Sequence, residues 1–206
     1  MKLLNLTLAF LAAATHGSTA QAQAPVRHVG TLVQAGSHYT LAEFHDPNIR
    51  LQSSANLDEF LDEVVDLTGS LQSSFTGNTQ DFQVANIGLA DRAFSSDDVG
   101  VLGSFARMRV DAVGTANYFV HVSLGHGYMP LTTYGPTVAG AFWLDPSIVL
   151  SVAGGALIGR WRGDLWIPND PFFLGLTLYF QAAVHEPGQP LLFLNSNPMT
   201  FTNAPL

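Results

Sequence analysis

The chain has 206 residues, of which 47% are hydrophobic and only 12% are charged, and its formal net charge is −8. This composition excludes intrinsic disorder, which requires low hydrophobicity and high charge, and it disfavours a helical bundle, whose exposed faces are normally covered by Lys, Glu and Arg. The chain has no Cys, which excludes disulfides, catalytic thiols and thiolate-bound metals.

The first residues have the pattern of a secretory signal peptide. Lys2 precedes an apolar run at residues 3–14, and Ala20-Gln21-Ala22 is a small-residue cleavage site. The run is too short to span a bilayer, so we expect no membrane insertion after the signal is removed. The sequence therefore predicts a signal peptide at residues 1–22 and a secreted protein, either extracellular or periplasmic.

The charge balance limits the partners of the mature chain. Lys2 is the only lysine, so the mature chain has no lysine and an excess of carboxylates. Nucleic-acid affinity comes largely from Lys and Arg that neutralise phosphates, and adsorption to anionic lipid needs the same residues. We therefore expect no basic stripe and no nucleic-acid partner.

Residues 23–94 are predicted to form a small β-barrel domain with one short helix. Asn56 is an N-capping residue that is followed three positions later by Glu59, and the apolar residues after it recur at one-turn spacing, which predicts an amphipathic helix. Alternation and turn residues predict the strands, and Gly36 lies in the first turn. The expected strands are 27–34, 37–44, 49–52, 65–75 and 81–89.

The segment Leu57–Leu71 resembles the middle of small bacterial OB-like barrels, in which a one-turn helix leads into a strand of the type Val-x-Leu-Thr-Gly-x-Leu. This resemblance implies an OB-like fold, and such folds commonly bind oligonucleotides or oligosaccharides. Arg50 is the only Lys or Arg between Val29 and Asp91, so a nucleic-acid role is again disfavoured.

Residues 95–206 are predicted to form an antiparallel β-sandwich, because strand-like segments alternate with turn clusters and no helical period is present. In the segment 176–181, alternation places Leu176 and Phe180 inward and Tyr179 and Gln181 outward. The expected strands are 106–113, 117–124, 138–143, 148–152, 160–167, 175–184 and 199–202.

This half also resembles a C-terminal module of uncharacterised secreted bacterial proteins. The matching residues are Ile167-Pro168-Asn169-Asp170-Pro171, then the segment 175–184 and the turn Pro187-Gly188. The resemblance implies a β-sandwich and carries no activity or ligand. Asp170 is expected to cap the chain that follows it, and Pro198, where the module has a strand residue, predicts that the final strand starts late.

Reactive centres are poorly supported by the sequence. Gly-x-Ser-x-Gly and His-Glu-x-x-His motifs are absent, and we predict no catalytic residue, no metal and no cofactor. Two weaker possibilities remain: that His28, His38 and His45 approach one another, and that loop carboxylates act in hydrolysis. The carboxylates considered are Asp145, Asp164 and Asp170. We interpret Arg162-Gly163-Asp164, the tripeptide of integrin ligands, as a coincidence.

Aromatic residues give the candidate binding site. Trp143, Trp161, Trp166 and Tyr179 lie in the second half, and exposed rings of this kind stack on flat apolar surfaces such as sugar rings. The alternative is that most of them fill the core. The leading hypothesis is a secreted, non-catalytic protein of the envelope or extracellular matrix that adheres to or binds a ligand, with extracellular polysaccharide or other envelope components as partners. The alternatives are a secreted hydrolase and a structural subunit that self-associates through strand edges.

Overall fold

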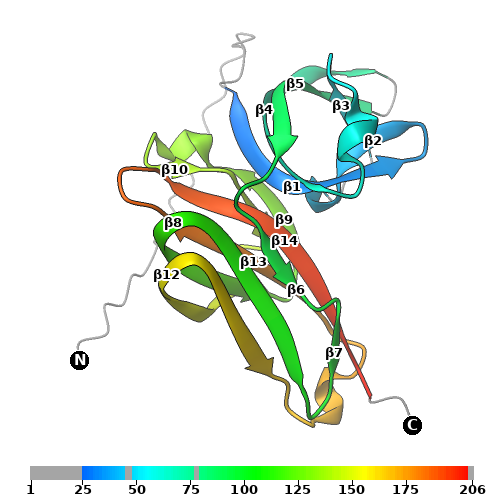
Figure 1. The fold of residues 1–206 in the computed structure, drawn as a ribbon. Helices are drawn as coiled ribbons and strands as arrows, with labels where there is room; N and C mark the ends of the chain where they lie inside the picture. The colour runs from blue at the N-terminus through cyan, green and yellow to red at the C-terminus, as the bar shows by residue number, and fades with distance from the viewer. Residues whose placement is uncertain (1–24, 45–47, 77–78, 204–206) are drawn as a thin grey trace.

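The computed structural model describes residues 25–44, 48–76 and 79–203, and this part of the chain consists of β-strands joined by turns and short 3₁₀ segments (Figure 1). The predicted mainly-β fold class is confirmed. The predicted signal peptide lies outside the described residues. Within the described ranges, no helix has the length and apolar character required to cross a membrane.

The first part of the chain forms a curled sheet with the strand order β2-β1-β4-β5-β3 (Figure 1). Its neighbours are antiparallel except β3 and β5, which are parallel. The turn predicted at Gly36 joins β1 to β2, and its φ of 62° suits a residue without a Cβ. The strands are β1 (Val26–Ala35), β2 (His38–Leu41), β3 (Ile49–Gln52), β4 (Val64–Thr76) and β5 (Thr79–Leu89).

The helix predicted after Asn56 is a single 3₁₀ turn, η2 (Leu57–Phe60). The predicted cap is present, because the Asn56 side chain accepts a hydrogen bond from the Asp58 N–H at 3.3 Å. The turn does not extend, since the chain after it pairs with β1 instead: the Asp62 N–H donates to the Leu32 carbonyl at 2.9 Å. Tertiary pairing therefore overrides the local helical pattern.

The second part forms a seven-stranded sheet with the order β10-β14-β13-β8-β12, in which β6 also pairs with β8 and β7 with β14. Two of its strands are much longer than predicted, because the chain bends at Gly114 (φ 74°) and Gly159 (φ 69°) without leaving the sheet. The strands are β6 (Phe94–Ser96), β7 (Val99–Val101), β8 (Phe105–Ser123), β10 (Val138–Ala139), β12 (Val149–Trp166), β13 (Thr177–His185) and β14 (Leu191–Thr202).

The last strand starts early, so the prediction of a late start is wrong. Strand β14 begins at Leu191 and continues through Pro198, which lies opposite Tyr179 of β13. On the other side of β14, β10 pairs only with its first residues and β7 only with its last three. Pro198 lies between these two contacts, where β14 has one strand partner, and proline is tolerated in such a position.

A two-stranded hairpin lies between the two large sheets and packs against both of them. Ala141 and Trp143 pack into the core of the five-stranded sheet, whereas Phe142 and Leu144 pack against residues of β13 and β14. Every residue of β11 is buried for this reason. The hairpin consists of β9 (His126–Pro130) and β11 (Ala141–Leu144), and between them lies the 3₁₀ segment η3 (Leu131–Tyr134).

The hairpin also explains why the predicted orientation of Gln181 is wrong. Gln181 is fully buried, because the hairpin covers the face of β13 that alternation leaves to solvent. Its Oε1 accepts from the backbone N–H of Trp143 at 3.0 Å. Its Nε2 donates to the backbone carbonyls of Ala141 and Leu194, each at 2.8 Å. One side chain thus fixes the hairpin to the sheet.

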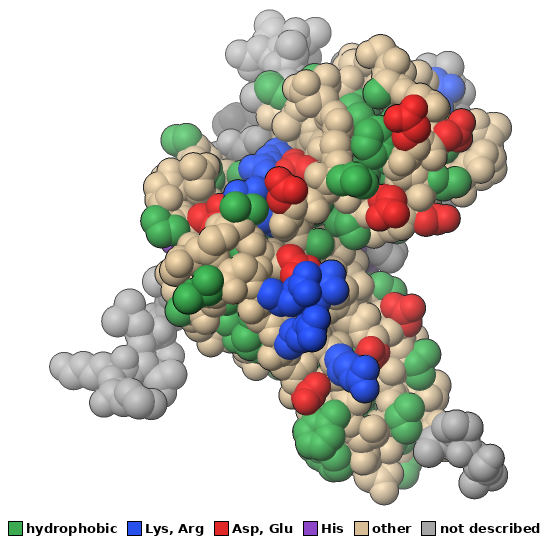
Figure 2. All heavy atoms as spheres, in the orientation of Figure 1, with side chains coloured by type: hydrophobic (Ala, Val, Ile, Leu, Met, Phe, Trp, Pro, Cys, Tyr) green, Lys and Arg blue, Asp and Glu red, His purple; other side chains and the backbone are tan. Residues whose placement is uncertain are grey.

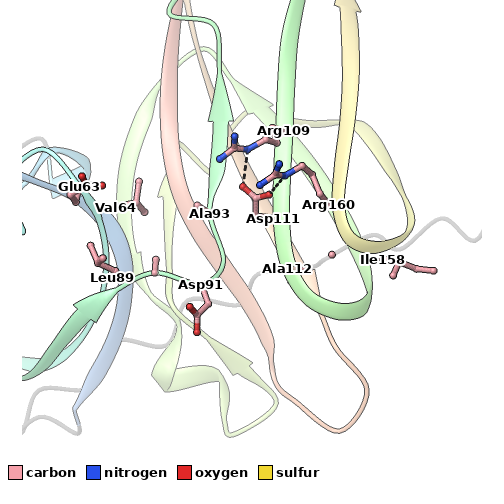
Figure 3. Close-up of a pocket in the computed structure, with 12 residues that line it drawn as sticks. Glu63, Val64, Leu89, Asp91, Ala93, Arg109, Asp111, Ala112, Ile158 and Arg160 are labelled. Carbon is pink, nitrogen blue, oxygen red and sulfur yellow. Dashed lines mark hydrogen bonds and ion pairs between the residues drawn. The ribbon is translucent and has the colours of Figure 1, made fainter.

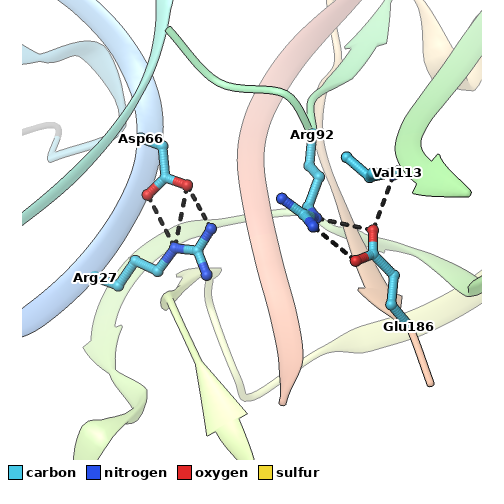
Figure 4. Close-up of polar contacts among 5 residues, drawn as sticks. All are labelled: Arg27, Asp66, Arg92, Val113 and Glu186. Atoms are coloured by element: carbon cyan, nitrogen blue, oxygen red, sulfur yellow. Dashed lines mark hydrogen bonds and ion pairs between the residues drawn. The ribbon is translucent and has the colours of Figure 1, made fainter. Parts of the chain in front are cut away.

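The segment that connects the two sheets is held by an ion pair (Figure 4). Arg92 Nε and one terminal nitrogen donate to the two carboxylate oxygens of Glu186 at 2.8 and 2.7 Å, and the Val113 N–H donates to the same carboxylate at 2.9 Å. The Arg92 guanidinium lowers the pKa of Glu186 below its ordinary value. A second pair, Arg27 with Asp66, joins β1 to β4 (Figure 4). The domain boundary predicted between residues 94 and 95 lies inside β6.

Candidate functional site

Two of the four predicted binding aromatics belong to the core. Trp143 is fully buried among residues of the five-stranded sheet, so its ring is inaccessible to a ligand. Trp161, on β12, is half-buried against the core of the seven-stranded sheet and stacks on Tyr118 with ring centroids 4.7 Å apart.

The other two lie far apart on the sheet. Tyr179 is half-buried and makes an edge-to-face contact with His126 of β9, at 5.3 Å between centroids. Trp166 ends β12 and is 52% exposed, opposite Phe105, which is 61% exposed. Their rings meet edge to face at 4.9 Å. The four aromatics therefore form no common groove, and only Trp166 presents a ring at the surface beside a second exposed ring.

The exposed Phe105–Trp166 pair lies at one end of a longer solvent-facing surface that β8 and β12 form together. Except at Gly114, the even-numbered residues of β8 from Ala106 to Val122 are buried in the core, and the odd-numbered ones point outward. Paired residues of β12 share the outward face. On this face, Phe105 and Trp166 are followed by a cluster of charged side chains.

The charged cluster comes from the same short motif on both strands. Residues 107–111 and 160–164 each have the pattern Arg-x-Arg-x-Asp, and the antiparallel register aligns the two motifs head to tail. Because strand side chains alternate with period two, every charged residue of both motifs lies on one face. The opposite pairs are Arg107 with Asp164, Arg109 with Arg162, and Asp111 with Arg160. We call these six residues the arginine cluster.

Only part of this charge is neutralised. Asp111 forms ion pairs with Arg109 at 2.7 Å and with Arg160 at 2.5 Å, as Figure 3 shows. Within the described residues, neither Arg107 nor Arg162 makes an ion pair. The cluster thus has four guanidiniums for two carboxylates, in a chain with eight Lys and Arg in all.

Two open hollows lie on either side of Arg109. One, of about 410 Å³, is lined by three arginines and two carboxylates of the segment around β6, β8 and β12. The other, of about 720 Å³, reaches from Asp111 and Arg160 to Glu63 and Asp91 near the five-stranded sheet (Figure 3). In Figure 2, Arg and acidic side chains gather over the region where β8 lies.

The expectation of no basic stripe is therefore wrong. Its error lay in counting charge along the chain, whereas half of all the Lys and Arg residues meet across two paired strands. The signal was the repeated pattern Arg-x-Arg-x-Asp, which becomes informative once both segments are assigned as paired antiparallel strands. The tripeptide at Arg162 lies inside this pairing, with Gly163 opposite Met108.

The carboxylates considered for hydrolysis do not form a pair. Asp145 lies at one end of β8, where its carbonyl accepts from the Ser123 hydroxyl, and Asp164 lies near the other end, opposite Arg107. Hydrogen bonds from Ser147 lower the pKa of Asp145. Asp170 caps the 3₁₀ segment η4 (Pro171–Phe173), as predicted, by accepting from the Phe172 N–H at 2.9 Å.

The histidines considered for a metal site are placed differently. His28 is fully buried in the core of the five-stranded sheet, His38 begins β2, and His45 lies outside the described residues. In the ranges that the structure describes, no three His, Asp or Glu side chains are grouped in a way that could hold a metal ion.

Comparisons with known proteins leave the site to be interpreted from its residues. No protein-family model matches the chain, and a search of the curated proteins finds no match. The resemblances noted for the two halves therefore stay predictions. The candidate site consists of the arginine cluster and the exposed Phe105–Trp166 pair, which lie on one face of the paired strands β8 and β12.

Proposed function

We propose that this protein is an exported, non-catalytic binding protein of the cell envelope or extracellular matrix, and that it holds a polysaccharide on the outward face of the paired strands β8 and β12. The signal-peptide pattern of residues 1–22 supports export. The observation that carries the proposal is the Phe105–Trp166 pair, whose rings are more than half exposed next to the arginine cluster.

This pair has the properties of a sugar platform. Both rings offer flat apolar surface to solvent, and Trp166 adds a polar N–H at its edge. Aromatic and Arg side chains are the residue types that contribute most at binding surfaces. Because the two residues are neighbours on paired strands, the backbone holds them side by side before a ligand binds, which lowers the entropic cost of binding.

The test is retention of the purified protein on a panel of polysaccharides and insoluble cell-wall material. We expect Trp166→Ala to weaken the affinity for a retained polysaccharide about tenfold, the usual effect of truncating an aromatic anchor. The matched control is Phe119→Ala, which removes a 42% exposed aromatic from the same face of β8, away from the cluster, and should leave binding unchanged. Retention on no member of the panel would contradict the proposal.

A second candidate, a self-associating structural subunit, is favoured by the free edge of β12. This 18-residue strand pairs only with β8 among the described residues, and it carries large exposed apolar side chains, including Ile158 at 81% exposure. Unpaired strand edges are templates for pairing with another chain.

Self-association predicts a sedimentation coefficient that rises with protein concentration. Ile158→Lys should hold the protein as a monomer over the same range, because a charge at an edge opposes edge-to-edge pairing. A wild-type coefficient independent of concentration would exclude this candidate and leave the binding function unaffected.

A further inference from the structure

We propose that the arginine cluster recognises an anionic polysaccharide, a chain whose sugars carry carboxylate or sulfate groups. This inference rests on the proposed binding function and specifies the chemistry of its ligand. It is carried by four guanidiniums on one face of two paired strands. Two of these guanidiniums, those of Arg107 and Arg162, form no ion pair with a carboxylate of the described residues.

Two like charges face each other at the centre of the cluster. Arg109 and Arg162 lie directly opposite each other, with Cβ atoms about 5 Å apart in such pairs, and like charges in that position destabilise a sheet. Asp111 compensates Arg109 and also Arg160, whereas Arg162 has no such partner in the described chain. An anion placed over Arg162 removes this repulsion.

The spacing of the arginines suits an anionic ligand. Guanidinium groups bind carboxylate and sulfate through paired N–H donors. Arg107 and Arg109 are two positions apart along β8, a distance of about 6.6 Å. Arg162 of β12 lies opposite Arg109. The three arginines line one hollow of about 410 Å³, within the size range of ligand sites. The second hollow, past Arg109, is also lined by Glu63, Asp91 and Asp111, so we assign the anionic group of the polysaccharide to the first hollow.

Carboxylates that line the first hollow favour a polysaccharide over DNA. Asp97 and Asp164 line the same hollow as the arginines, and their carboxylates accept hydrogen bonds from sugar hydroxyls. The DNA backbone has charge at every nucleotide and no hydroxyls to offer, so these carboxylates oppose it.

The experiment measures the affinity of the full mature chain for three polymers with one backbone: dextran, carboxymethyl-dextran and dextran sulfate. Single-stranded DNA is the fourth probe. We expect at least one charged dextran to bind more tightly than dextran, and this binding to weaken as NaCl is raised.

The variants are Arg107→Gln and Arg162→Gln, which remove charges that form no ion pair with described residues and so spare the fold. Each should lower the affinity for the charged dextran about tenfold, and Arg162→Lys should fall between Arg162→Gln and the wild type, because it keeps the charge and loses the paired donors. The control Arg50→Gln removes one positive charge from β3, where Arg50 pairs with Asp81, and should bind like the wild type.

The outcomes separate this inference from the proposed function. If dextran binds as tightly as its charged derivatives and only Trp166→Ala weakens it, the inference is overturned and the binding function stands. If Arg107→Gln and Arg162→Gln bind charged dextran like the wild type, or if DNA binds more tightly than every dextran, the inference is also overturned. If no polymer binds and the polysaccharide panel retains nothing, both are overturned.

Discussion

Replacing Trp143 with alanine should lower the free energy of unfolding by about 3–5 kcal/mol, the cost of truncating a fully buried Trp. Trp143 has no exposed surface, and its ring contacts those of His28, Phe44 and Tyr128 at centroid distances of 5.2–5.6 Å. The cavity that the missing ring leaves cannot easily collapse. The backbone N–H of residue 143 donates to the Gln181 side chain, and this hydrogen bond holds β11 in place. The substitution therefore removes apolar contacts from both the hairpin and the five-stranded sheet.

The measurement is equilibrium unfolding in urea, and Trp166→Ala is the matched control. Both variants lose an indole, but Trp166 is 52% exposed, so its loss should cost less than about 1 kcal/mol. The two residues thus have separate expected effects: Trp143→Ala lowers stability, and Trp166→Ala lowers polysaccharide affinity. Equal losses of stability in the two variants would contradict the described packing of the hairpin.

Local features were predictable from the sequence because their causes are local. The turn at Gly36 needs a left-handed residue, and the caps at Asn56 and Asp170 need a short acceptor side chain beside a free N–H. Apolar and β-branched alternation gave the mainly-β class. Each of these signals is contained in a few consecutive residues.

Features that depend on a distant segment were not predictable. Gln181 alternates like an outward residue and is buried because β11 covers it. Trp143 looked like a candidate binding residue, yet each face of its short strand meets a different sheet. The long strands β8 and β12 were each predicted as two strands. Glycines such as Gly114 and Gly159 normally mark turns, and here they only bend the paired strands.

The candidate site was missed for the same reason. Its arginines are separated by about fifty residues along the chain and meet only through the register that sets Arg109 opposite Arg162. The sequence analysis chose four aromatic residues by type. Of these, Trp166 is exposed, and the other three contact neighbouring rings in the core or at its edge. A site made by strand register becomes visible when the strands are paired, because register decides which side chains share a face.

Acidification should destabilise the fold through His28 by about 4–5 kcal/mol in total. His28 is fully buried, and its ring is surrounded by those of Phe44, Phe82, Tyr128 and Trp143 at 5.2–5.7 Å. Burial lowers the pKa of His28 from 6.5 to about 3. The imidazole is therefore neutral in the folded protein over a range in which it is charged in the unfolded chain.

The sign of the effect follows from proton binding. Below pH 6.5 the unfolded chain takes up a proton on His28, whereas the folded protein does so only near pH 3. The unfolded state binds more protons in this window, so the free energy of unfolding falls by about 1.4 kcal/mol for each pH unit of acidification. The contribution is complete above pH 6.5 and is lost as the pH falls to about 3.

Glu43 acts in the opposite direction and must be separated from His28. Its carboxyl group is buried and accepts from the Thr31 N–H at 2.8 Å, and burial raises its pKa from 4.5 to about 8 despite these hydrogen bonds. The stability that it contributes is complete below pH 4.5 and is lost as the pH rises to about 8. Between pH 4.5 and 6.5 the two residues therefore oppose each other in the wild-type profile.

The difference between the wild type and His28→Leu isolates the histidine, because Glu43 is common to both. Urea unfolding at a series of pH values from 7 to 3 should show the wild type losing about 4–5 kcal/mol relative to the variant. Leucine has no proton to bind and suits the apolar surroundings formed by Phe44, Phe82 and Trp143. Profiles that stay parallel would mean that His28 takes up its proton over the same pH range in the folded and unfolded states, which is incompatible with a hairpin packed over it.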